Sequence, residues 1–180
     1  MSSEQKEEQK FDIINKARHY NSHPSGVECI ELAERLPFNT GNAFKYVFRC
    51  GDKGNPRQDL EKALYYVKRE AQHLKNLIRW RTTAEVEKMW VDEHFTATDL
   101  GNLEKIVRAE HDFWTRSVYQ RLFRHNVRIT AYIKELELAV GDIEVLIRRL
   151  DDPTYGDPKP ALNSVTTIHT DWQKGGLPQN

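Results

Sequence analysis

Apolar residues recur at helical spacing over most of this chain. Between residues 57 and 81 they return every three or four positions and mark one buried stripe, which predicts a single long helix. The stripe consists of Leu60, Leu64, Val67, Ala71, Leu74 and Ile78. After Thr82 and Thr83 the pattern weakens, and we expect it to resume as far as His94.

Shorter helical segments come before this stripe. Residues 11–18 fit one or two amphipathic helical turns, and residues 27–36 fit a short helix. A third helix is expected to begin at a cap provided by Asn39 or Thr40 and to run to about Cys50.

A second stripe extends from residue 100 to residue 150, where no proline occurs. One helix of this length would measure about 75 Å, which is too long for a compact domain of this size. We therefore expect either a break near residues 124–126 or a projecting helical hairpin. We expect this stripe to be longer than the small core can cover, and an apolar stripe left in water marks an interface. The stripe consists of Leu103, Ile106, Phe113, Val118, Leu122, Ile129, Ile133, Leu136, Val140, Ile143 and Ile147.

No convincing alternation typical of strands occurs, so the sequence predicts an all-α protein with a core of short helices followed by long helices in a hairpin or bundle. We divide the chain into a disordered tail at 1–10, a core at 11–81, a helical extension at 82–150 that brings subunits together, and a loose tail at 151–180 with several prolines and glycines.

Composition narrows the class of protein. The chain has 180 residues, with 27 basic and 27 acidic side chains, so bulk nucleic acid and anionic membrane surfaces are not expected partners. No apolar run approaches the length of a membrane span, and Met1 to Lys10 lacks the apolar stretch of a signal peptide. Two cysteines, Cys29 and Cys50, are too few for a disulfide framework, which favours a reducing cytoplasm.

Positive charge is concentrated in one segment. Residues 41–81 carry ten basic and four acidic side chains, a net charge of +6. Such a segment in a neutral chain indicates either a local anion site or a solvated helix face.

The expected helix before Cys50 carries a polar face within this segment. Asn42, Lys45 and Arg49 follow the spacing i, i+3 and i+7, so they share one side of the helix. Buried cations need an anionic partner, and Lys53 in the next turn adds a third charge. One interpretation is a bound anion. The other is ion pairing inside the fold with Glu28, Glu31 or Asp59.

Four ordered blocks carry a family resemblance. They are His19-Tyr20; the run from His23 to Glu31, His-Pro-Ser-Gly-Val-Glu-Cys-Ile-Glu; Gly41-Asn42 with Lys45-Tyr46, Arg49, Gly51 and Lys53-Gly54; and Asp59-Leu60 with Lys62-Ala63 and Tyr66. Together they resemble the SaV-like phage proteins, which are similar to the catalytic core of the phage nucleotide kinases that lack a P-loop. The resemblance covers residues 18–70.

The resemblance implies phosphoryl transfer from a nucleoside triphosphate to a nucleoside monophosphate such as dTMP or dGMP. It also implies a homo-oligomer and the cytoplasm of an infected bacterial host. Mg²⁺ is the expected cofactor, because it accompanies the nucleotide in such reactions. The chain has no Gly-x-x-x-x-Gly-Lys-Ser/Thr phosphate loop.

The site residues follow from these blocks. Lys45, Arg49 and Lys53 are expected to neutralise the phosphates. The residues expected to contact phosphate, ribose or base are His19, Tyr20, His23, Asn42 and Tyr46. Glu28 and Glu31 are candidates for holding Mg²⁺. Lys62 and Tyr66 are four residues apart, and they fit a solvated helix face as well as they fit this site.

Two other functions remain open. The unmatched helices after residue 82 fit a non-enzymatic phage protein that binds a host protein or nucleic acid. An all-α nucleotide pyrophosphohydrolase is the other alternative, because Glu28-x-x-Glu31 imitates the first acidic pair of those enzymes. The second pair, Glu-x-x-Asp, is missing from the sequence.

Overall fold

The structure is a computed structural model, and it describes residues 23–82, 84–85, 95–124 and 127–156. Several expectations concern segments outside these residues. They are the tail at 1–10, the helix at 11–18, the continuation of the long helix over 86–94 and the tail from 157 onward.

The described residues form six helices and no strand, which confirms the all-α prediction. The helices are α3 (Cys29–Ala33), α4 (Phe38–Phe48), α5 (Pro56–Trp80), α7 (Ala97–Ala109), α8 (Phe113–Leu122) and α9 (Ile129–Arg149).

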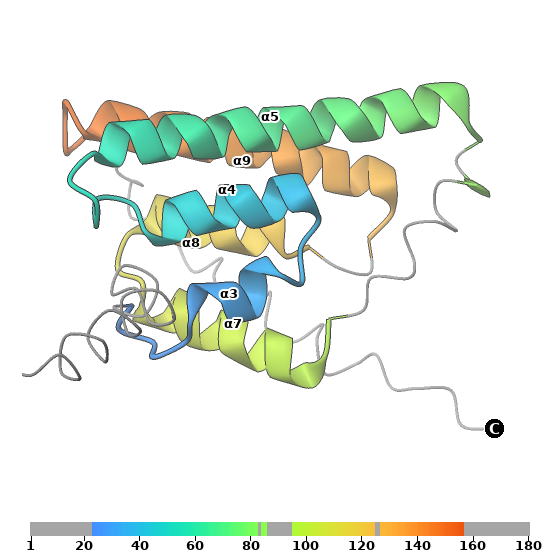
Figure 1. Ribbon diagram of the computed structural model, residues 1–180. Helices are drawn as coiled ribbons and strands as arrows, with labels where there is room; N and C mark the ends of the chain where they lie inside the picture. Colours follow the sequence, from blue (N-terminus) through green and yellow to red (C-terminus); the bar gives the residue numbers. More distant parts are fainter. Residues whose placement is uncertain (1–22, 83, 86–94, 125–126, 157–180) are drawn as a thin grey trace, which may run out of the picture.

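The helices are arranged in two layers of three (Figure 1). One layer holds α3, α4 and α5 in chain order, and the other holds α7, α8 and α9. Across the layers, α5 packs on α9, α4 on α8 and α3 on α7. Ion pairs from Lys68 to Glu144 and from Lys75 to Glu137, at 3.0 and 2.6 Å, fix α5 and α9 in an antiparallel register.

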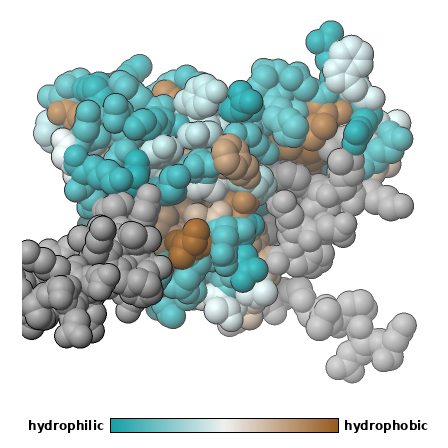
Figure 2. Space-filling view, viewed as in Figure 1, coloured by the Kyte–Doolittle hydropathy of each residue, from teal (hydrophilic) through white to brown (hydrophobic). Residues whose placement is uncertain are grey.

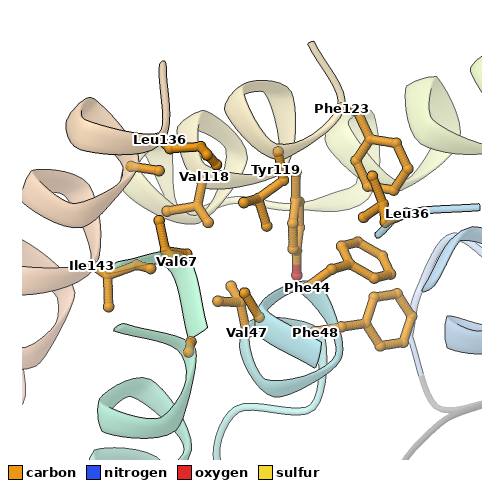
Figure 3. Packing of buried hydrophobic residues seen from close by; sticks show 14 of the residues in the cluster. Leu36, Phe44, Val47, Phe48, Val67, Val118, Tyr119, Phe123, Leu136 and Ile143 are labelled. Atoms are coloured by element: carbon orange, nitrogen blue, oxygen red, sulfur yellow. The ribbon is translucent and has the colours of Figure 1, made fainter. Parts of the chain in front are cut away.

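A single hydrophobic core lies between the two layers (Figure 3). The ring of Phe44 on α4 meets the rings of Tyr119 and Phe123 at centroid distances of 5.4 and 5.2 Å. Val67 on α5 and Ile143 on α9 are also fully buried. The second half of the chain therefore completes the core of the first half.

This packing corrects one expectation about the second stripe. We expected it to be longer than the core could cover, but most of it is buried inside the chain itself. The buried members are Leu103, Ile106, Val118, Leu122, Ile129, Ile133, Leu136 and Ile143. Because most of the stripe is buried, it no longer gives a reason to expect subunit assembly. The homo-oligomer stays a prediction.

The second stripe is divided among three helices. The break expected near residues 124–126 is confirmed, since α8 ends at Leu122 and α9 begins at Ile129. A second break at residues 110–112 was not expected. There the side chain of Asp112 caps α8 by accepting a hydrogen bond of 2.8 Å from the backbone N–H of Thr115.

Candidate functional site

The polar face predicted for α4 exists and is partly open to solvent. Asn42, Lys45 and Tyr46 are half-buried, whereas Phe44 and Val47 point into the core. The Lys45 ammonium donates a hydrogen bond of 2.8 Å to the side-chain oxygen of Asn42. The amide nitrogen of Asn42 donates to the carbonyl oxygen of Phe38 at 2.7 Å. Asn42 thus links the lysine to the helix backbone and orients it.

Helix α4 begins at Phe38 with Pro37 at the N-cap position, two or three residues before the caps expected at Asn39 or Thr40. Neither predicted cap acts as one. The hydroxyl of Thr40 donates to the carbonyl oxygen of Pro37, and the amide nitrogen of Asn39 donates to Glu70 on α5 at 2.7 Å. The Asn39–Glu70 contact ties the start of α4 to the middle of α5.

Arg49 is buried rather than presented to solvent. It is 7% exposed, and its Nη2 lies 3.1 Å from Oδ1 of Asp59, which is 3% exposed. Of the two interpretations left open for this arginine, ion pairing inside the fold is present. Asp59 therefore joins α5 to the end of α4, and the side chain of Asn55 caps α5. A role for Arg49 in phosphate neutralisation stays a prediction.

Tyr46 is surrounded by positive charge. The Lys45 ammonium lies 5.0 Å from the ring centroid, the Arg49 guanidinium 4.6 Å and the Lys62 ammonium 5.5 Å. On α5, the ring of Tyr66 stacks on that of Tyr46 at 5.9 Å and an interplanar angle of 13°. We call the surface formed by Asn42, Lys45, Tyr46, Lys62 and Tyr66 the cationic–aromatic face.

The cationic–aromatic face has a net positive charge. Within the part of the chain that the structure describes, no carboxylate lies within ion-pairing distance of Lys45 or Lys62. Lys62 instead donates to the side-chain oxygen of Gln58 at 2.9 Å. The carboxylate of Asp59, near the start of α5, is engaged by Arg49 beneath the surface. Such a face attracts anions.

The sequence leaves Lys62 and Tyr66 open between this site and a solvated helix face, and the expected site residues do not include them. The available signal was their spacing of four residues, which puts them on one side of α5, in a block next to the α4 motif. Lys62 and Tyr66 reach Tyr46 because α5 folds back against α4. Spacing within one helix does not predict this tertiary contact.

The other expected site residues lie elsewhere or outside the described chain. His19 and Tyr20 are outside it. Lys53 is exposed in the turn after α4, where Gly51 and Gly54 adopt positive φ angles of 89° and 77°. Among the described residues, Lys53 makes no hydrogen bond or cation–π contact with the cationic–aromatic face.

His23 packs on the core side of α4. Its ring stacks on that of Phe48 at 4.7 Å, and its Nδ1 lies 2.8 Å from the hydroxyl of Ser25. Burial lowers the pKa of His23 below its ordinary value, although the charges of Glu110 and Asp52 act in the opposite direction. At neutral pH this histidine is therefore uncharged.

The two glutamates proposed for Mg²⁺ support α3. One carboxylate oxygen of Glu31 accepts a hydrogen bond of 2.9 Å from the backbone N–H of Glu28, forming a capping box. The other accepts from the amide of Asn102 on α7, also at 2.9 Å. Across the described residues no group of three or more His, Cys, Asp and Glu side chains could hold a metal ion by itself. Magnesium bound together with a nucleotide stays a prediction.

Comparison with known proteins identifies one matching family model. Residues 14–68 match a family described as proteins of unknown function, DUF3310. No curated protein and no solved structure matches the chain significantly. The matched segment includes α3, α4 and the first half of α5, and so it contains the whole cationic–aromatic face.

The described helices differ from membrane-spanning helices. None of them combines the length and the apolar character that crossing a bilayer would need.

Proposed function

We propose that this protein is a nucleotide kinase without a P-loop, which transfers a phosphoryl group from a nucleoside triphosphate to a (deoxy)nucleoside monophosphate such as dTMP or dGMP. The cationic–aromatic face would hold the nucleotides. The observation that carries the proposal is the position of Tyr46, with an aromatic neighbour on one side and three cations around it.

This combination fits the two halves of a nucleotide. Phosphates are bound by Lys and Arg, and the ammonium of Lys45 is oriented by Asn42 and has no carboxylate among the described residues to neutralise it. The rings of Tyr46 and Tyr66 provide apolar surface against which a base can pack. A small inorganic anion would use the cations and leave the rings without a role.

The chemistry of the reaction asks for charge and positioning. An oxygen of the acceptor monophosphate attacks the γ-phosphorus of the donor, and the bond from that phosphorus to the β–γ bridging oxygen breaks. The products are two nucleoside diphosphates. The acceptor oxygen is already anionic, so no general base is required, and catalysis depends on neutralising the negative charge of the transferring group. Lys45 and Lys62 are placed for this task, together with Mg²⁺ brought by the donor.

Arg49 acts differently in this proposal. Its buried ion pair with Asp59 joins α4 to α5 directly beneath Tyr46. The pair would keep Lys45 on one helix and Lys62 on the other at a fixed separation, and the charge of Arg49 adds to the field at the ring.

The proposal is tested by incubating the full chain with Mg·ATP and each deoxynucleoside monophosphate, and measuring diphosphate formation by chromatography. We expect Lys45→Ala to lower kcat/KM by roughly 100-fold, as loss of one charge-stabilising donor commonly does. The matched control is Lys134→Ala, which removes an exposed lysine of α9. The proposal is wrong if no acceptor yields a diphosphate, or if Lys45→Ala is as active as the control.

The same incubation distinguishes the proposed kinase from the alternative of a nucleotide pyrophosphohydrolase. That enzyme would release pyrophosphate from a triphosphate without any acceptor. The structure weakens this alternative, because both carboxylate oxygens of Glu31 accept hydrogen bonds within the fold.

A further inference from the structure

We propose that the outward face of α5, beyond the cationic–aromatic face, binds single-stranded nucleic acid. The residues that carry this inference are Tyr65, Arg69, Arg79 and Trp80. None of these four residues belongs to the nucleotide site, so variants at them test this proposal separately from the proposed kinase activity. Lys62, at the start of the face, is common to both sites.

The outward face is a continuous strip along the helix. Its positions are separated by three or four residues, so they share the side opposite to the buried stripe. Because the helix rises 1.5 Å per residue, the strip from Lys62 to Trp80 is about 27 Å long. Its members are Lys62, Tyr65, Arg69, His73, Asn76 and Trp80.

Large aromatic side chains are open to solvent on this strip. Tyr65 is 57% exposed and Trp80 is 79% exposed. Next to the strip, Phe38 at the start of α4 is 75% exposed and meets the ring of Tyr66 edge-on at 6.1 Å. In Figure 2 the upper edge of the molecule, over α5, is mainly hydrophilic with paler and apolar residues set among the polar ones. These rings are therefore available to a ligand.

The strip is also poor in negative charge. Between Lys62 and Trp80 the only acidic residue is Glu70, which is 4% exposed and accepts a hydrogen bond from Asn39. On the flank of the helix, Lys68 and Lys75 are neutralised by glutamates of α9.

Three cations on α5 remain without a carboxylate in ion-pairing distance among the described residues, and each contacts an aromatic residue instead. The Lys62 ammonium lies over Tyr46. The Arg69 guanidinium donates to the hydroxyl of Tyr65 at 3.4 Å. The Arg79 guanidinium lies 5.4 Å from the ring of Trp80. A ring with an adjacent cation thus occurs twice on α5, at Tyr65 and at Trp80. The Lys62–Tyr46 contact between α5 and α4 continues this arrangement into the cationic–aromatic face.

This repetition favours a single strand as the partner. Proteins bind single strands without strong sequence preference by stacking bases on aromatic rings and contacting phosphates with cations. A duplex hides the faces of its bases, so it would leave the rings unused. An acidic polypeptide would meet the cations and give no role to Tyr65 and Trp80. DNA and RNA share the required chemistry.

The test measures fluorescence anisotropy of labelled 12-nucleotide oligo(dT), oligo(U) and a DNA duplex with the full chain. We expect binding of at least one single strand at micromolar concentration, at least tenfold tighter than the duplex. With three phosphates contacted, log K should fall with log salt at a slope of about −2. Comparison of oligo(dT) with oligo(U) shows whether the site prefers DNA or RNA, and binding of either oligonucleotide supports the proposal.

Surface variants locate the site. Tyr65→Ala and Trp80→Ala should each weaken binding at least about fivefold, through loss of stacking. Arg69→Gln should reduce the salt slope by about 0.7. The control is Arg108→Ala on α7, which lies in the tier of helices farthest from α5 (Figure 1). Circular dichroism checks that each variant is folded.

Several results would overturn the proposal. They are absence of strand binding, duplex binding as tight as single-strand binding, affinities of Tyr65→Ala and Trp80→Ala equal to that of the control, or equally tight binding of poly-glutamate. If the chain binds single-stranded nucleic acid but forms no nucleoside diphosphate, this proposal is supported and only the proposed kinase activity is contradicted.

Discussion

Lys45 and Arg49 lie four residues apart on α4, and the fold uses them differently. Arg49 is buried against Asp59, whereas Lys45 is half-buried, held by Asn42 and directed to the surface. Helical spacing placed both on one side of α4. It does not tell which of them meets solvent, because that depends on where α5 crosses α4.

The buried ion pair should contribute strongly to stability. We expect Asp59→Ala to lower the free energy of unfolding by about 3–5 kcal/mol, because the buried guanidinium of Arg49 loses this carboxylate. The measurement is urea denaturation followed by circular dichroism. As a control, Asp151→Ala breaks the exposed pair with Arg57 and should cost about 1 kcal/mol or less. Equal losses in the two variants would contradict the buried pair.

Both cysteines should be unreactive in the folded protein. Burial raises the pKa of Cys29 to about 12, although Lys45 and Arg49 act in the opposite direction. Burial, with added repulsion from Asp59 and Asp52, raises the pKa of Cys50 to about 11. At pH 8 the thiolate fraction is then on the order of one in a thousand or less, and the thiolate is the reactive form. We expect slow alkylation by iodoacetamide in buffer and fast alkylation of both thiols in guanidinium chloride. A fast-reacting thiol in the native protein would refute this.

At the scale of helices, the sequence predicted elements best where one periodic pattern meets a clear boundary. The stripe of α5 follows the turn at Asn55 and Pro56, and the helix starts there because Asn55 accepts a hydrogen bond from the backbone N–H of Gln58. The division between α7 and α8 was missed because the apolar spacing continues across it. The available signal was Asp112, a residue type that favours the helix N-cap.

One glycine determines how closely α3 and α4 pack. A Cβ added at Gly41 would lie 2.5 Å from the backbone carbonyl oxygen of Ala33, so the helices would have to move apart. We expect Gly41→Ala to destabilise the protein by about 1–3 kcal/mol. In Gly101→Ala on α7 the added Cβ meets nothing within 4 Å, and the substitution should stabilise by up to about 1 kcal/mol through helix propensity. Thermal unfolding compares the two variants, and a Gly41→Ala protein as stable as Gly101→Ala would show that α3 and α4 do not pack this closely.

At the scale of the whole molecule, α7, α8 and α9 form part of the same core as the helices of the matched family segment. Phe44 of α4 packs on Tyr119 and Phe123, and Val67 of α5 is buried in the same cluster as Ile143 of α9. The sequence predicted both sets of helices but not their mutual packing. Periodicity identifies which residues of a helix are buried, and it does not identify the element that covers them.

The shared core makes the first half dependent on the second. We expect a chain ending at Thr83 to show no cooperative thermal unfolding, because Phe44 and Val67 would lose the helices that cover them. Cooperative unfolding of the truncated chain, followed by circular dichroism, would contradict a single core.

For the full chain, light scattering tests the expected homo-oligomer, and a mass near 21.1 kDa at micromolar concentration would refute it.

The candidate site was partly predictable for the same physical reason. Asn42, Lys45 and Tyr46 share one helix, so their proximity follows from spacing within a single element. Lys62 and Tyr66 join them only because the turn at residues 51–55 folds α5 back along α4, and that contact between helices carries no local sequence signal.

The central claim is that the cationic–aromatic face binds nucleotide phosphates, and a backbone amide NMR titration with dTMP, ATP and pyrophosphate tests it most directly. We predict that shift changes for all three ligands centre on Lys45, Tyr46 and Lys62, that they weaken as salt rises, and that they disappear in Lys45→Ala but not in Lys134→Ala. Shift changes centred on α7 or α9, or no change with any of the three ligands, would contradict the account.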